Sequence, residues 1–176
     1  MKLYYAPGAC SLAPHILLRE TGADFRLEKV DLATHRTTDG ADYRDINPKG
    51  YVPLLELADG QRLGEGAVIS QYIAERANRA DLLPAPDSPE RYRVLEWQTF
   101  IGSELHKSFA PFFKPGHDEN ARHRARQQLE TRFQWLAGEL GAAYLTGDAF
   151  TIADAYLFTV ANWSCLLYTS PSPRDA

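Results

Sequence analysis

The chain of 176 residues contains only two cysteines, Cys10 and Cys165. Two cysteines cannot form the disulfide framework of a small secreted domain, and no pair of cysteines or histidines has the spacing of a structural zinc site. Lysine and arginine form no long block and the formal net charge is −4, which argues against a nucleic-acid partner. No apolar run approaches the roughly 18 residues of a membrane helix, and no signal-peptide segment is evident. These absences indicate a cytoplasmic protein with no metal and no membrane partner.

The remaining composition is that of a globular chain, with 44% apolar and 24% charged residues. Residues 2–5 have the composition of a short strand, and apolar residues at helical spacing predict a helix over about 11–21. Residues 25–32 are typical of a second strand. The polar stretch 33–47 is expected to be a loop that carries a short helix.

A hairpin is predicted for residues 52–57 and 61–63, because Asp59-Gly60 is a favoured tight turn. A helix over about 66–78 follows, with an expected apolar face of Val68, Ile69, Tyr72, Ile73 and Ala77. The order β-α-β-(α)-β-β-α over about 80 residues predicts a mixed α+β domain, with helices on the faces of one sheet.

Prolines concentrate at residues 84–89, and strand patterns stop after them. We therefore divide the chain into a domain over 1–81, a linker over 82–89 and an all-helical domain over 90–163.

Two long helices are predicted in the second domain, over 90–109 and about 120–140. The aromatic residues of 109–116 either line a cavity or belong to the core. Thr151 and Asp154 form a capping box that opens a third helix, with Thr151 accepting from the third helical N–H and Asp154 reaching back to the cap amide. Such a cap is worth about 1 kcal/mol.

Cys10 lies where the first strand meets the first helix. The unpaired N–H groups of a first helical turn favour a thiolate, so the sequence predicts that the pKa of Cys10 is lowered and that Cys10 is the more reactive thiol. The alternative is that Cys10 only fills space as a small apolar residue.

Five motifs in order resemble the glutathione S-transferases, specifically the bacterial beta class. They cover residues 1 to about 163, and they are Gly8-Ala9-Cys10-Ser11, Asn47-Pro48-Lys49-Gly50-Tyr51-Val52-Pro53, Glu65-Gly66, Ser103-Glu104-Leu105-His106 and Phe150-Thr151-Ile152-Ala153-Asp154-Ala155-Tyr156. The resemblance implies a thioredoxin-like glutathione-binding domain followed by a helical domain.

For the first domain, the resemblance implies that Pro53 is a cis proline and that the main chain of Val52 pairs with the cysteinyl unit of glutathione. It implies that Glu65 attracts the ligand's ammonium group and that the N–H of Gly66 binds its carboxylate, although many relatives have a hydroxyl at position 66. Taken separately, Val52-Pro53 could be an ordinary strand edge and Glu65 an ordinary acid at a helix start.

For the second domain, the resemblance directs Ser103 and His106 toward Cys10, and their spacing of three places both on one helix face. His106 is then expected to bond to the sulfur and favour its anion, whereas a histidine on a helix is more often solvated or part of the core. His35 and Thr99 stand where relatives commonly have Lys and Asn in contact with glutathione. A neutral His35 implies weaker glutathione binding.

The resemblance implies a cytoplasmic, homodimeric enzyme of detoxification that joins glutathione, as co-substrate and without a cofactor, to small apolar electrophiles. Cys10 would either hydrogen-bond the bound thiol or form a mixed disulfide with it. The alternatives are a glutathione-dependent thiol–disulfide oxidoreductase or peroxidase, and a non-catalytic protein that binds apolar ligands. Residues 164–176 are expected to be an aberrant tail, because the family pattern stops inside a helix and Pro171 and Pro173 prevent its continuation beyond about Tyr168.

Overall fold

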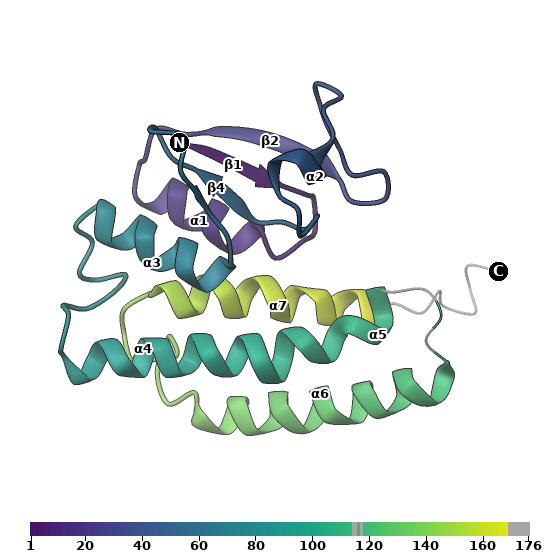
Figure 1. The fold of residues 1–176 in the computed structure, drawn as a ribbon. Helices are drawn as coiled ribbons and strands as arrows, with labels where there is room; N and C mark the ends of the chain where they lie inside the picture. Colours follow the sequence, from purple (N-terminus) through teal and green to yellow (C-terminus); the bar gives the residue numbers. More distant parts are fainter. Residues whose placement is uncertain (114–115, 117, 169–176) are drawn as a thin grey trace. The chain divides into compact units, whose positions relative to one another are not determined.

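The computed structural model describes residues 1–113, 116 and 118–168. The chain forms two compact units, one over Met1–Ala85 and one that begins at Pro86. Figure 1 shows the elements of each unit.

The first unit is built on a five-stranded sheet in the order β3-β2-β1-β4-β5. Its strands are β1 (Lys2–Tyr5), β2 (Arg26–Asp31), β3 (Arg36–Thr37), β4 (Leu54–Glu56) and β5 (Arg62–Leu63). β1 is parallel to β2, and the other neighbouring pairs are antiparallel. Three helices complete the unit, α1 (Leu12–Glu20), α2 (Tyr43–Ile46) and α3 (Gly66–Arg76).

Both faces of this sheet are covered. Leu3 and Tyr4 are neighbours on β1 and both are buried, so they occupy opposite faces of the sheet. Tyr4 belongs to a core cluster that includes Tyr43 of α2. α1 and α3 pack against each other below the sheet (Figure 1). The mixed α+β fold expected for this half of the chain is confirmed.

Two details of the sheet differ from the predictions. The strand β3 was missed, because its two residues lie in a polar stretch with no apolar alternation. The predicted hairpin is confirmed, since β4 pairs with β5, but β4 begins at Leu54 rather than at residue 52.

The predicted apolar face of α3 is only partly right. Ile69 and Ile73 are buried as expected, but Ser70 and Ala74 are buried with them. Val68 is 48% exposed, so it points away from the core.

The described part of the second unit is helical. Its elements are α4 (Pro89–Phe100), the π-helical turn η1 (Ile101–Leu105), the 3₁₀ turn η2 (His106–Phe109), α5 (Ala110–Phe113), α6 (Glu119–Glu139) and α7 (Ile152–Tyr168). Ser88 caps α4 and Asp118 caps α6, each accepting from a backbone N–H three residues on.

The predicted helix over 90–109 is therefore not a uniform α-helix. The N–H of His106 donates to the carbonyl of Ile101, five residues earlier, which is the π-helical pattern. The helical path continues to Phe113. Phe109 is fully buried and packs against Trp163 with ring centroids 5.5 Å apart, so this aromatic is core. Residues 114, 115 and 117 lie outside the described part.

The capping box at α7 forms with a different hydrogen-bond pattern. Asp154 accepts from the N–H of Thr151 as predicted, at 2.8 Å. The Thr151 hydroxyl donates to the same carboxylate at 2.7 Å rather than accepting from the helix, so that half of the prediction is wrong. The N–H of Leu145 donates to the other carboxylate oxygen at 2.9 Å. Asp154 is 8% exposed, and it joins the preceding loop to the helix.

α7 extends to Tyr168, the last described residue. The rest of the tail predicted to depart from the family pattern, residues 169–176, lies outside the described residues. Within the part of the chain that the structure describes, no helix is both long and apolar enough to cross a membrane.

Candidate functional site

Cys10 is held by the loop between β1 and α1. The buried Ser11 hydroxyl accepts from the N–H of Ala6 at 3.2 Å and donates to its carbonyl at 3.3 Å, which closes the loop. The carbonyl of Cys10 accepts from the N–H of Ala13 at 3.3 Å. The thiol donates to the carbonyl of Val52, with Sγ and O 3.3 Å apart. Local hydrogen bonds thus direct Cys10 toward the segment before β4.

Burial raises the pKa of Cys10 to about 11. The N–H groups of Cys10 and Ser11 lower this pKa, as the position near a helix start predicts, but desolvation is larger. The carboxylate of Glu65 raises it further. The predicted lowering of the Cys10 pKa is therefore wrong, and the structure holds Cys10 as a neutral hydrogen-bond donor.

Val52 and Pro53 meet the first residue of α3. The peptide bond between them is cis, as the family resemblance implied. Val52 is 3% exposed. A Cβ built on Gly66 would lie 3.7 Å from Cγ of Pro53, an ordinary contact distance. The start of α3 therefore lies directly beside Pro53, with room for a small side chain at position 66.

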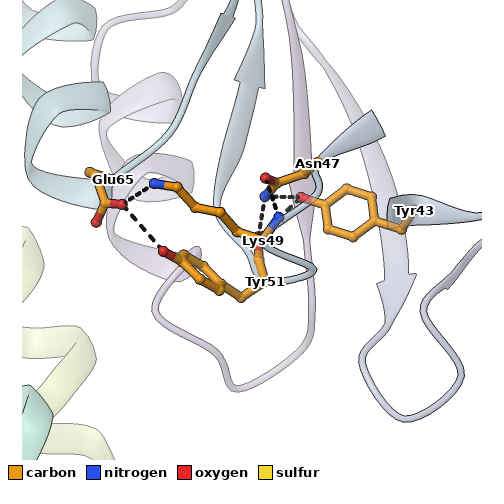
Figure 2. A network of polar contacts seen from close by, with 5 residues as sticks. All are labelled: Tyr43, Asn47, Lys49, Tyr51 and Glu65. Atoms are coloured by element: carbon orange, nitrogen blue, oxygen red, sulfur yellow. Dashed lines mark hydrogen bonds and ion pairs between the residues drawn. The ribbon is translucent and has the colours of Figure 1, made fainter. Parts of the chain in front are cut away.

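Glu65 is exposed and lies at the N-cap of α3 with a positive φ of 62°. One carboxylate oxygen accepts from Lys49 Nζ at 2.7 Å and from the Tyr51 hydroxyl at 3.4 Å (Figure 2). Lys49 and Tyr51 belong to a motif that the sequence singled out, but their contact with Glu65 was not predicted. Because Gly50 between them has a φ of 72°, the segment does not alternate like a strand, and no local pattern in the sequence signals the contact.

Tyr43 of α2 and Asn47, the residue that follows α2, hold residues 49–51 in place. The Asn47 amide donates to the carbonyl of Tyr51 at 2.8 Å, and the Tyr43 hydroxyl donates to the same oxygen at 3.2 Å (Figure 2). Asn47 also accepts from the N–H of Lys49 at 3.3 Å. Because Tyr43 is fully buried, this segment has a rigid support.

His35 reaches the same segment from the loop before β3. Its imidazole packs on Gly50, where a Cβ would lie 3.0 Å from the ring, and Gly50 has a φ of 72°. Only glycine fits at position 50 without strain. Nδ1 of His35 is buried and has no hydrogen-bond partner in the described structure.

The six predicted site residues of the first unit therefore form one continuous group. Cys10 contacts Val52, Pro53 adjoins Gly66, and Glu65 connects through Lys49 to the segment on which His35 packs. The group contains a half-buried thiol, the main-chain carbonyl that accepts from it, a helix start and an exposed ion pair.

Thr99 and Ser103 lie on the helical path of the second unit. Both are exposed, and each hydroxyl donates to the carbonyl four residues earlier in its own helix, at 2.8 Å and 3.0 Å. Such bonds are readily exchanged for bonds to a ligand or water.

His106 is half-buried and its Nδ1 lies 2.7 Å from the Tyr156 hydroxyl. Its ring meets the Trp163 ring edge to face, with centroids 4.9 Å apart. Burial, with a smaller effect of Lys107, lowers the pKa of His106 to about 4. The imidazole is thus neutral at physiological pH. Ser103 and His106 were predicted to share a face on the assumption of a regular α-helix. That assumption is wrong, because the turn between them is π-helical.

No group of three His, Cys, Asp or Glu side chains among the described residues is arranged to hold a metal ion.

Sequence comparison matches both parts of the chain to one family. The model of the glutathione S-transferase N-terminal domain matches residues 8–76, and that of the C-terminal domain matches residues 100–173. Glutathione S-transferase GstA of Escherichia coli O157:H7 is 48% identical over 165 residues, which are 93% of this chain and 82% of the relative.

Two solved structures have the same fold. A sphingomonad glutathione S-transferase complexed with glutathione is 44% identical with a TM-score of 0.92, and the match covers 97% of this chain and 85% of that one. A bacterial beta-class glutathione S-transferase of Sphingomonas chungbukensis is 43% identical with a TM-score of 0.91, with the same coverage of 97% and 85%. The chain belongs to the glutathione S-transferase family and groups with its bacterial beta class.

Proposed function

We propose that this protein joins the thiol of glutathione to small electrophiles. The observation that carries the proposal is the contact of the Cys10 thiol with the carbonyl of Val52, beside the cis proline and the start of α3. A polar sulfur donor, a main-chain segment next to a cis proline and helical N–H groups suit a cysteine-containing peptide thiol.

In this proposal, glutathione binds along the first unit. The main chain of Val52 pairs with the cysteinyl unit, and the N–H groups at the start of α3, including that of Gly66, bind the γ-glutamyl carboxylate. Glu65 binds the ammonium group, which requires its ion pair with Lys49 to open or to be shared. Both side chains of that pair are more than half exposed, so opening it costs little. The proposal assigns the glycyl carboxylate to Lys49 and to His35, whose ring packs on Gly50.

Cys10 acts as a neutral donor in this proposal. A thiol whose pKa is about 11 keeps its proton at pH 7 and can donate it in a hydrogen bond to the sulfur of glutathione. That bond favours the thiolate of the ligand, because a donor stabilises the charged form of its acceptor. The same pKa argues against Cys10 as the attacking thiolate of a disulfide exchange.

The second unit supplies Thr99, Ser103 and His106 in this proposal, and the electrophile packs against it. Thr99 and Ser103 offer exposed hydroxyls, and His106 offers an imidazole. No resident cofactor takes part, since glutathione is itself the co-substrate.

We also propose that the chain works in the cytoplasm as a homodimer. An aromatic cluster of Trp97, Phe100 and Trp135 supports a second copy as partner, with Phe100 and Trp135 centroids 4.8 Å apart and Trp135 47% exposed. Sedimentation at micromolar concentration should show a species with twice the mass of one chain. The Trp135→Glu variant should sediment with the mass of a single chain. A single-chain species in the unmodified protein would refute the dimer.

Kinetics with two acceptors test the function. The proposal predicts turnover of a chloronitrobenzene with glutathione, faster than reduction of a glutathione mixed disulfide. Faster disulfide reduction, lost in Cys10→Ser, would favour an oxidoreductase. Saturable binding of apolar ligands with neither activity would indicate a binding protein.

A further inference from the structure

Lys49 places its own ammonium group on the carboxylate of Glu65. Nζ of Lys49 lies 2.7 Å from Oε1 of Glu65, although the two residues are 16 positions apart in the sequence (Figure 2). The same Nζ lies 5.7 Å from the centre of the Tyr51 ring, within the range of a cation–π contact. A Cβ built on Gly64 would lie 4.0 Å from it. The ammonium of Lys49 therefore lies beside the residues that lead into α3, on the carboxylate to which the proposed function assigns the ammonium of glutathione.

The ammonium of Lys49 and that of the ligand compete for this carboxylate. The hydrogen bond to Glu65 raises the pKa of Lys49, so the amine is charged at neutral pH. The ammonium of a γ-glutamyl peptide has the same charge and the same three N–H donors. In the free protein, Lys49 is thus an internal substitute for the ammonium of the ligand.

The main chain at Lys49 is held in place, whereas its side chain lies in solvent. The N–H of Lys49 donates to the Asn47 side chain at 3.3 Å, and the Asn47 amide donates to the carbonyl of Tyr51 at 2.8 Å. The side chains of Lys49 and Glu65 are 54% and 58% exposed. An ion pair this exposed contributes little to stability, so a change of rotamer at Lys49 suffices to open it.

We propose that Lys49 is a specificity-determining residue, which occupies the ammonium site on Glu65 in the free protein and leaves it when a ligand brings an ammonium of its own. This inference rests on the proposed function for the place of the ligand's ammonium. After its displacement, Lys49 is available to the glycyl carboxylate that the proposed function assigns to it. When a ligand has no ammonium, Lys49 stays on Glu65 and offsets its negative charge.

Removal of the Lys49 charge therefore acts in opposite directions on two kinds of ligand. A ligand with an ammonium no longer has a competitor and binds more tightly. A ligand without one meets a Glu65 carboxylate that has lost its lysine and that repels the ligand's own γ-glutamyl carboxylate. Because the pair is exposed, each change in affinity is about two- to fivefold.

The test measures binding by titration calorimetry to the unmodified full chain and to Lys49→Met, which removes the charge and keeps the length of the side chain. The ligands are glutathione, glutathione ethyl ester, in which the glycyl carboxylate is blocked, and a deaminated analogue, in which hydrogen replaces the ammonium. Lys29→Met is the matched control, because Lys29 is an exposed lysine of β2 outside this group of contacts. Lys49→Arg retains the charge.

In Lys49→Met, the ethyl ester should bind about two- to fivefold more tightly and the deaminated analogue about two- to fivefold more weakly. Glutathione should change less than the ester, because it loses both a competitor and a partner for its glycyl carboxylate. Lys29→Met and Lys49→Arg should bind all three ligands as the unmodified protein does.

Two results would overturn the inference alone. The first is that glutathione binds, but the ester binds Lys49→Met no more tightly than the unmodified protein. The second is a shift of the ester and the deaminated analogue in the same direction, which would indicate a general effect of charge. If glutathione does not bind the unmodified protein, the proposed function is refuted and the inference with it.

Discussion

The Cys10 thiol should react slowly with alkylating reagents at neutral pH when glutathione is absent. Burial raises its pKa from the usual 9.0 to about 11. Raising the pKa by this much corresponds to about 2.7 kcal/mol, and at pH 7 about one molecule in 10⁴ carries the thiolate. The exposed Cys165 should therefore be labelled first, which reverses the expectation from sequence.

The raised pKa of Cys10 also makes the free energy of unfolding depend on pH. The unfolded chain loses the Cys10 proton near its ordinary pKa, while the folded chain retains it. The contribution of this group to the free energy of unfolding is thus complete below about pH 9 and is lost as pH rises through about 11.

The assay uses the Cys165→Ser variant, in which Cys10 is the remaining thiol, with Cys10→Ser as the matched control. The rate of labelling by iodoacetamide, followed by mass spectrometry, should rise about tenfold per pH unit through pH 9–10 without a plateau. In urea the same rate should level off above about pH 9. A plateau below pH 8 in the folded protein would refute the argument that burial outweighs the helix start.

Three further predictions concern other residues. His106→Asn should lower turnover with glutathione, because the proposed function uses the imidazole to favour the thiolate, and unchanged kinetics would contradict that role. Asp154→Ala should lower the free energy of unfolding by about 3 kcal/mol, because three donors lose a buried carboxylate. The cap expected from the sequence is worth only about 1 kcal/mol. Urea unfolding measures the change, with Asp148→Ala as control, and a loss below about 1 kcal/mol would contradict the prediction. Gly66→Ser should lower KM for glutathione about two- to tenfold, since its Cβ fits beside Pro53 and its hydroxyl adds one donor. Gly66→Ala is the control there, and the same KM in both variants would show that the hydroxyl makes no bond.

The order of elements in the first unit could be predicted because each has a local signal. The Asp59-Gly60 turn specifies the hairpin of β4 and β5, and Gly22 ends α1 with a φ of 63°. Strand β3 has only two residues, and its pairing with β2 depends on a contact that no local pattern encodes.

The identities of the site residues could be predicted through motifs, but their electrostatics could not. Proximity of Cys10 to a helix start is visible in the sequence, whereas its desolvation and its contact with Val52, 42 residues later, depend on the fold. The ion pair of Lys49 with Glu65 likewise joins segments 16 residues apart.

The π-helical turn η1 is where the predicted helix over 90–109 departs from a regular α-helix. Apolar residues from Val94 to Leu105 fit an α-helical spacing, so no sequence pattern indicated the i to i+5 bond between Ile101 and His106. A turn of this kind is selected by tertiary packing, here by Tyr156 against Gly102 and His106.

The central claim is that Cys10 stabilises the thiolate of bound glutathione while remaining protonated itself. The ultraviolet absorbance of the thiolate, titrated against pH in complexes of glutathione with the unmodified protein and with Cys10→Ala, tests it most directly. The claim predicts that the bound thiol has a lower pKa than free glutathione in the unmodified protein, and that most of this lowering is lost in Cys10→Ala. The same pKa for the bound thiol in both proteins would contradict it.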